Sequence, residues 1–239
     1  MGLVAYHYTS IPMNESTHPD EDNIADTCFI AGAENPTPIR LVKADDDGAW
    51  RRDYTESQLA WLQRQSFTAK SGQIAWLEDA GGAMVLSGWD GKDNLTSLGH
   101  LPLQLPEGDY ELVDPVTDLQ LIGWGLGGYQ FTRYKEAERQ PARLVLPAHN
   151  NGDLVINTTV AVALTRNLIN TSAQDMAPSH LEAEVLALAE AFDAACDVTV
   201  GDALLDNDCG AIHAVGRAAQ DAPRLIDCLL YTSPSPRDH

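Results

Sequence analysis

The sequence predicts an α/β protein in which helices alternate with short buried strands. Three observations lead to this prediction. Short apolar runs bounded by turn residues occur at 73–77, 83–89 and 142–147, which is typical of strands. Longer stretches carry apolar residues at helical spacing, and two of them begin with the pattern of a capping box. The alternation of the two kinds of element favours a largely parallel sheet.

Each element of the first half follows from a local pattern. Thr55, followed three residues later by Gln58, is a capping box and predicts the start of a helix with Leu59, Leu62 and Phe67 on its apolar side. The six residues after the last apolar run, Ala-His-Asn-Asn-Gly-Asp, are typical of a linker. In chain order we expect a strand at 39–42, the helix after Thr55, a strand pair at 73–77 and 83–89, a strand at 109–113, a helix over 116–138 and a strand at 142–147.

The second half predicts two helices followed by two strands. An apolar-periodic helix is expected over 154–170, and Ser179 with Glu182 forms a second capping box. The segments 197–205 and 211–219 then read as strand, turn and strand. The apolar face of the helix after the second box consists of Leu181, Val185, Leu188 and Phe192.

Length and charge limit the possible functions. With 239 residues and 44% hydrophobic content, the chain can bury one sizeable core or two modest ones. The net charge of −20 argues against nucleic acid and against anionic membranes as partners, since both need clusters of Lys and Arg. No apolar run approaches the roughly 18 residues of a spanning helix, and the first residues lack a signal peptide. We therefore expect a soluble, cytoplasmic protein. Residues 1–26, which include a polar and acidic stretch, are expected to be a disordered leader; the alternative is a later start at Met13.

The cysteines are widely spaced and include no Cys-x-x-Cys pair. This spacing is typical of reduced thiols in a cytosolic protein, and it does not suggest a disulfide framework or a zinc ribbon. The four cysteines are Cys28, Cys196, Cys209 and Cys228.

One glycine motif has the spacing of a cofactor-binding turn. Gly123, Gly125 and Gly128 satisfy the Gly-x-Gly-x-x-Gly spacing of dinucleotide-binding turns. That site requires a strand-to-helix turn and an acidic residue about 20 positions later, where this chain has Arg143. We therefore expect these glycines to allow close helix packing against the sheet, with no cofactor bound.

Other candidate ligand groups fit no complete site. Asp45, Asp46 and Asp47, and the segment 206–210, lack the ligand spacing of a calcium loop and are interpreted as solvated turns. His213 lies in an apolar run and is expected to be a hydrogen-bonded core or interface residue. The histidines form no zinc-binding pattern; they are His7, His18, His100, His149, His180, His213 and His239.

Several separated segments, in order, resemble the leucyl aminopeptidase (cytosol aminopeptidase) family over roughly residues 38–227. The family's Arg-Asp-Leu-x-Asn-x-Pro junction is matched in part, with Asn167 in place of aspartate and Ser172 in place of proline. Asn167 lacks the negative charge of the family's aspartate, so an ion pair at this interface is in doubt. The segment "IHAVGRA…APRLI" resembles the strand that leads into the family's metal-binding region. The junction residues that match are Arg166, Leu168, Asn170, Ala173, Met176 and Pro178.

The resemblance implies a macro-like N-terminal α/β domain with a mixed sheet flanked by helices (27–150), a linker helix (151–170) and the start of a truncated α/β catalytic domain (171–227). It also implies a two-metal exopeptidase that removes N-terminal residues from peptide substrates, with leucine favoured. The family's enzymes assemble as homohexamers. The two ions, Mn or Zn, hold and activate water. The family's ligand motifs follow the "APRLI" segment and do not occur in this chain, so we expect no catalytic, metal or cofactor-binding residue in it.

Two alternatives follow from the same resemblance. The chain could be a stand-alone macro-like module for an ADP-ribose-like ligand, or a non-catalytic assembly domain. Calorimetry with ADP-ribose tests the first alternative, and we expect no heat of binding.

The last residues do not continue the family pattern. Residues 228–238, "CLLYTSPSPRD", read as neither strand nor helix, and all eleven match the translation of a transposon-end sequencing adapter. A natural Pro- and Ser-rich tail is the alternative. We expect 228–239 to be an artefactual tail, which leaves Cys228 outside the natural protein.

Overall fold

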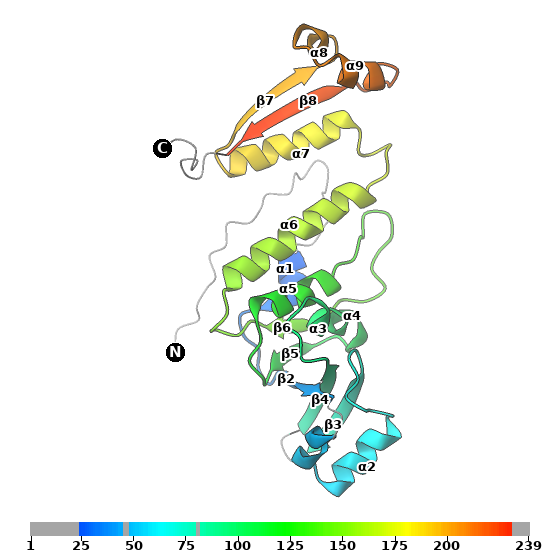
Figure 1. Cartoon of the computed structure of the whole chain (residues 1–239), viewed down its shortest axis with the longest axis vertical. Helices are drawn as coiled ribbons and strands as arrows, with labels where there is room; N and C mark the ends of the chain where they lie inside the picture. Colours follow the sequence, from blue (N-terminus) through cyan, green and yellow to red (C-terminus); the bar gives the residue numbers. More distant parts are fainter. Residues whose placement is uncertain (1–23, 45–47, 80–81, 231–239) are drawn as a thin grey trace. The chain divides into compact units, whose positions relative to one another are not determined.

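The structure is a computed structural model that describes residues 24–44, 48–79 and 82–230 (Figure 1). Internal contacts divide these residues into two compact units, one that runs through Ala163 and one that begins at Leu164. The boundary lies inside a single helix, α6 (Gly152–Asn170).

Unit 1 is built on a mixed sheet of six strands in the order β1-β6-β5-β2-β4-β3. Neighbouring strands are parallel, except that β3 and β4 form an antiparallel hairpin. The central strand places Ile39 opposite both Val85 and Leu112. The α/β class and the mixed sheet are therefore confirmed. The strands are β1 (Phe29–Ile30), β2 (Thr37–Lys43), β3 (Ile74–Asp79), β4 (Gly82–Trp89), β5 (Asp109–Leu112) and β6 (Arg143–Val145).

Capping boxes begin two helices of unit 1. The Thr55 N–H donates to Gln58 Oε1 at 2.9 Å and the Gln58 N–H donates to Thr55 Oγ1 at 3.3 Å, which confirms the predicted box. Thr117 and Gln120 form a second box at α5 that the sequence analysis did not identify. The helices of unit 1 are α1 (Ile24–Cys28), the 3₁₀ helix η1 (Ala49–Asp53), α2 (Glu56–Arg64), α3 (Thr96–Gly99), α4 (Leu101–Gln104), α5 (Asp118–Gly127) and the first part of α6.

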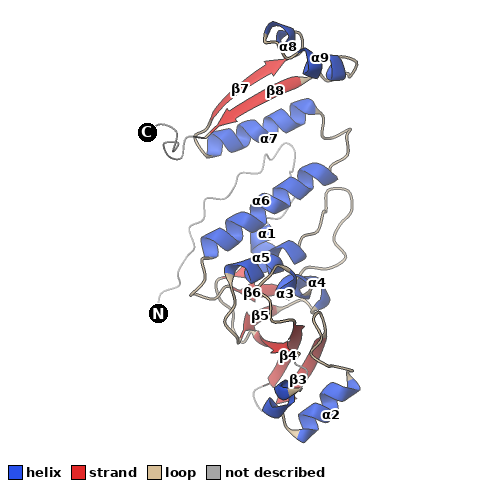
Figure 2. Ribbon diagram, in the orientation of Figure 1, coloured by secondary structure: helices blue, strands red, loops and turns tan. Residues whose placement is uncertain are grey.

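The core of unit 1 has two centres. Helices α1, α3 and α4 pack around α5, whose Trp124 is fully buried and donates its indole N–H to the Cys28 carbonyl at 3.2 Å (Figure 2). The second centre lies between β2–β4–β3 and α2, where Trp50 meets Phe67 edge-to-face at 5.5 Å. Together these centres bury both faces of the sheet's middle strands, as a parallel sheet requires.

Unit 2 is a helix against a two-stranded ribbon (Figure 2). Strands β7 and β8 are antiparallel, and α7 packs on both. Its elements after α6 are α7 (Pro178–Ala191), β7 (Ala195–Val200), α8 (Ala203–Asp206), α9 (Gly210–Gly216) and β8 (Arg224–Leu229).

Two expected elements are wrong. The helix expected to run to 138 ends at Gly127, because four glycines between 123 and 128 remove helix propensity and the chain then enters a loop. The run 211–216, expected as a strand, is helix α9. A run of six residues is too short to separate the two periods, and the alanines in this run favour the helix.

Boundaries also differ at both ends of the described chain. Residues 24–26 of the expected leader belong to α1, whereas residues 1–23 lie outside the described residues. Strand β1, with only two residues, was not predicted. Strand β8 continues through Cys228 and Leu229, the first two residues of the segment expected to be neither strand nor helix.

Helix α7 also begins differently from the expectation. The helix starts at Pro178, and His180 takes the place expected for Glu182, because its Nδ1 accepts the Ala177 N–H at 3.0 Å. Proline is well suited to the first helical position. On the expected apolar face, Leu181 and Phe192 are 42% and 46% exposed.

Candidate functional site

The glycine motif lies inside and at the end of α5, and not at a strand-to-helix turn. A Cβ on Gly123 would lie 2.1 Å from the Leu95 carbonyl oxygen, and one on Gly125 would lie 2.5 Å from Thr159 Oγ1 of α6. At Gly128 it would lie 2.4 Å from Cys28 Sγ. The motif therefore lets helices approach one another closely. This packing involves mainly helix neighbours, whereas packing against the sheet was expected from the sequence.

The acidic candidates do not form a cation site in the described residues. Asp45, Asp46 and Asp47 lie outside them. The segment 206–210 joins α8 to α9 through Asp208, which adopts a left-handed φ of 56°. Across 24–44, 48–79 and 82–230, no three His, Cys, Asp or Glu side chains come close enough together to hold a metal ion.

His213 is a structural histidine. It lies on α9 with its side chain 15% exposed, and its Nε2 is 3.0 Å from Asp202 Oδ1, a carboxylate that is 96% exposed. This pair ties α9 to the turn that follows β7.

His100 and Ser87 lie close together in unit 1, as the members of a catalytic Ser–His pair would. Ser87 Oγ lies 3.4 Å from His100 Nε2, and burial lowers the pKa of His100. However, Ser87 is fully buried, so its hydroxyl cannot reach a substrate from solvent. The pair therefore satisfies buried polar groups and does not supply a nucleophile. His7, His18 and His239 lie outside the described residues.

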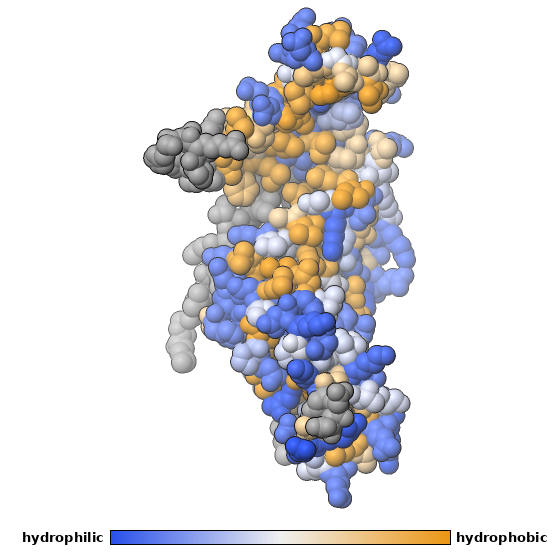
Figure 3. Space-filling view, in the orientation of Figure 1, coloured by the Kyte–Doolittle hydropathy of each residue, from blue (hydrophilic) through white to orange (hydrophobic). Residues whose placement is uncertain are grey.

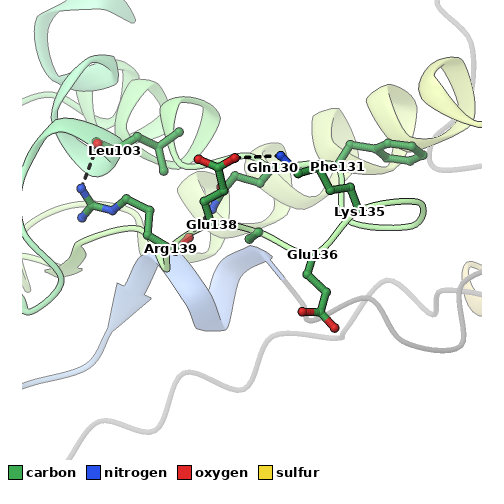
Figure 4. Close-up of a pocket in the computed structure, with 8 residues that line it drawn as sticks. Leu103, Gln130, Phe131, Lys135, Glu136, Glu138 and Arg139 are labelled. Carbon is green, nitrogen blue, oxygen red and sulfur yellow. Dashed lines mark hydrogen bonds and ion pairs between the residues drawn. The ribbon is translucent and has the colours of Figure 1, made fainter.

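One open pocket of about 330 Å³ lies between α4 and the loop that follows α5 (Figure 4). The Arg139 guanidinium reaches the carbonyls of Leu103, at 3.1 Å, and Leu105. Gln130 donates to the Arg139 carbonyl at 2.9 Å, and Lys135 pairs with an exposed carboxylate. Glu136 points away from the other lining side chains in Figure 4. These contacts fasten the loop to α4, and the lining offers no nucleophile with an adjacent base.

A charged network joins β8 to the start of α7. Arg224 binds Glu182 and also Asp221, the latter at 2.8 Å. Asp221 Oδ2 accepts the Ser179 N–H at 2.7 Å, and the hydrogen bonds from Ser179, followed by the charge of Arg224, lower the pKa of Asp221. No local sequence pattern predicts this network, because Ser179 and Asp221 are 42 residues apart.

The most unusual surface belongs to unit 2. Among its described residues, the buried apolar side chains are only Leu164, Ala189, Leu204 and Pro223. Apolar side chains spread instead over the β7–β8 ribbon and α7 (Figure 3). The exposed large apolar side chains in the described part of unit 2 are Ile169, Leu181, Leu186, Phe192, Val200, Leu205, Ile212, Val215, Leu225, Leu229 and Leu230.

Exposure of this many large apolar side chains is unusual for a soluble domain of this size. Burying one such side chain contributes roughly 1.5–3 kcal/mol, so eleven exposed ones leave much of the hydrophobic driving force unused. Unit 1, which has about twice as many described residues, exposes six: Trp61, Leu95, Val113, Leu119, Tyr134 and Leu154. The described part of unit 2 therefore presents a large apolar surface for its size.

Comparisons with known proteins match both units. The profile described as M17 aminopeptidase, N-terminal domain, matches residues 37–147, and the profile described as cytosol aminopeptidase family, catalytic domain, matches residues 163–239. Peptidase B of Serratia proteamaculans (strain 568) is 27% identical over 181 residues, which is 72% of this chain and 40% of that protein. The chain thus spans less than half of this relative.

Solved structures agree with this comparison. The cytosol aminopeptidase from Coxiella burnetii is 29% identical with a TM-score of 0.75, over 85% of this chain and 46% of that one. A tomato leucine aminopeptidase mutant is 18% identical with a TM-score of 0.62, over 85% and 49%. The bottromycin maturation enzyme BotP, solved in complex with Mn, is 17% identical with a TM-score of 0.62, over 82% and 45%. The last two likenesses concern the fold alone. In the part of the chain that the structure describes, no helix has both the length and the apolar character needed to cross a membrane.

Proposed function

This chain belongs to the M17 (cytosol) aminopeptidase family, and we propose that it is the N-terminal domain, linker helix and first catalytic-domain elements of a leucyl aminopeptidase. The family and its relatives are aminopeptidases, which are hydrolases of the peptide bond at the N-terminus. The observation that carries the proposal is the pair of consecutive family matches, 37–147 and 163–239, in a chain that spans 40% and 46% of two relatives.

The family depends on divalent metal ions, and we propose two ions, zinc or manganese, for the whole enzyme. When bound, such ions polarise the scissile carbonyl and activate a water molecule. The described residues of this chain do not fit such a centre, because no three metal-ligating side chains converge among them. We therefore assign no metal ligand and no catalytic residue within the described chain. We propose that the exposed apolar residues of unit 2 pack against the rest of the catalytic domain in the whole enzyme.

Activity measurements test this assignment directly. The full-length enzyme encoded by the parent gene is expected to hydrolyse leucyl-p-nitroanilide, to lose that activity when a chelator removes its metal, and to regain it with added Mn²⁺ or Zn²⁺. The 239-residue chain, purified and assayed under the same conditions, is expected to give no hydrolysis above background. Metal-dependent turnover by this chain alone would contradict the proposal.

We propose also that the whole enzyme acts in the cytoplasm on peptide substrates, as a homohexamer. The name cytosol aminopeptidase, carried by the Coxiella burnetii relative, supports the location. Light scattering coupled to size exclusion on the full-length enzyme tests the assembly, and a monomer of unchanged activity would exclude the hexamer.

A further inference from the structure

Two cysteines face each other across the β7–β8 ribbon. Cys196 of β7 is the direct register partner of Cys228 of β8. The two residues lie 32 positions apart in the sequence, and no Cys-x-x-Cys spacing marks them as a pair.

The register places this pair at a position without backbone hydrogen bonds between its two members. The Gly201 N–H donates to the Pro223 carbonyl at 2.8 Å, so 201–223 is a hydrogen-bonded pair. Hydrogen-bonded and non-hydrogen-bonded pairs alternate along an antiparallel ladder, and the register runs without a bulge to Ala195 and Leu229. Cys196 and Cys228 therefore form a non-hydrogen-bonded pair.

This position suits a covalent bond between the two side chains. Non-hydrogen-bonded pairs bring Cα atoms to about 4.5 Å. Disulfides span Cα separations of about 4.4–6.8 Å, so no movement of the strands is needed.

The two thiols are in hydrogen-bonding contact, and their surroundings disfavour the Cys196 thiolate. Burial raises the pKa of the Cys196 thiol, and so do its contact with the Cys228 thiol and the neighbouring carboxylates Asp197 and Asp227. Cys228 is exposed and Cys196 is half-buried, so a small oxidant reaches Cys228 first. In contrast, Cys28 is fully buried in unit 1, where burial raises its pKa to about 11.

We propose that Cys196 and Cys228 form an intramolecular disulfide by exchange with a low-molecular-weight disulfide such as glutathione disulfide. The Cys228 thiolate attacks one sulfur of glutathione disulfide, and one glutathione leaves as its thiolate. The Cys196 thiolate then attacks Sγ of Cys228, and the second glutathione leaves. The two protein thiols lose two electrons and two protons, and glutathione disulfide is reduced to two molecules of glutathione. Because Cys228 lies in the segment expected to be adapter-encoded, the inference concerns this polypeptide and not its relatives.

The test uses the full 239-residue chain treated with glutathione disulfide. Thiol titration after denaturation is expected to fall from four thiols per chain, one per cysteine, to two. The intact mass is expected to drop by about 2 Da, with no glutathione adduct retained. The reaction should accelerate as the pH rises, since both attacking groups are thiolates.

Three variants make the test specific. Cys196→Ser is expected to hold a stable glutathione adduct on Cys228, because no second thiol displaces it. Cys209→Ser, the matched control, is expected to behave like the parent chain, and it leaves Cys196 as the one thiol of the tryptic peptide 167–217. In this control, the peptide should be linked to peptide 225–237. A parent chain that keeps the adduct on Cys228, or that forms only dimers between chains through Cys228, would overturn the proposal; so would unchanged oxidation in Cys228→Ser.

Discussion

At the scale of single residues, the glycines of α5 lie where neighbouring backbone leaves no room for a side chain. A Cβ on Gly127 would lie 1.8 Å from the Gly99 carbonyl oxygen of α3, whereas one on Gly32 would meet no atom within 4 Å. Backbone cannot yield as a flexible side chain does, so α5 and α3 would have to separate.

Replacement of Gly127 by alanine is therefore expected to destabilise unit 1 by about 1–3 kcal/mol, despite the better helix propensity of alanine. Urea unfolding followed by circular dichroism measures the change. Gly32→Ala serves as the control, and its free energy of unfolding should stay the same or rise slightly. Equal effects at both positions would contradict the packing argument.

His100 gives unit 1 a dependence on pH. Burial lowers the pKa of this side chain in the folded protein below its ordinary value of 6.5. The unfolded chain therefore binds the proton more readily, and stability is lost as the pH falls through about 6.5 and below.

Melting temperatures at pH 8 and pH 5.5 check this expectation. The drop in melting temperature between these pH values is expected to be smaller in His100→Gln than in the parent chain. The expectation fails if His100→Gln shows the full drop.

At the scale of elements, Arg224 joins a strand to a helix that lies far away in the sequence. Its guanidinium is the shared partner of Glu182 on α7 and of Asp221 just before β8. The three side chains are 11%, 21% and 26% exposed, so their hydrogen bonds are only partly screened by water.

Arg224→Met removes these contacts and keeps most of the side-chain stem. Hydrogen exchange at β8 is expected to become faster, by the equivalent of about 1–3 kcal/mol of local stability. Asp221 contributes stability above its unfolded pKa of 3.8 and loses it as the pH falls further, because its folded pKa is lowered. The difference between the variant and the parent chain should therefore shrink below about pH 4. Lys92→Met, at an exposed pair with a 4.0 Å separation, is the control and should change nothing.

Elements whose signals are local could be predicted from the sequence. The box at Thr55 and Gln58 and the β3–β4 hairpin each depend on residues a few positions apart, and both were predicted. Strand β1 has two residues, too few for any periodicity, and α9 has too short an apolar run to distinguish a helix from a strand. The contacts of Arg224 and the Cys196–Cys228 register arise only when distant segments pack together, so a single sequence gives no signal for them.

At the scale of the molecule, the two units differ in how much apolar surface they bury. The exposed apolar residues of unit 2 favour association, and the net charge of −20 opposes it only through screened repulsion at physiological salt.

The 239-residue chain is therefore expected to self-associate and to bind a hydrophobic dye. Size exclusion with light scattering is expected to show large or mixed species. A shorter chain of residues 24–163, which omits most of the exposed set, should elute as a monomer. A monodisperse parent chain with one cooperative melting transition would contradict this expectation.

The aromatic and sulfur-bearing residues allow the two units to be followed separately. All five tryptophans, at 50, 61, 76, 89 and 124, belong to unit 1, where Trp124 is buried and Trp61 is about half exposed. Three of the four cysteines belong to unit 2, and the fourth is the buried Cys28. Indole fluorescence thus reports only on the first unit, while the rate of thiol alkylation reports mainly on the second, and one denaturant titration can tell whether they come apart together or in turn.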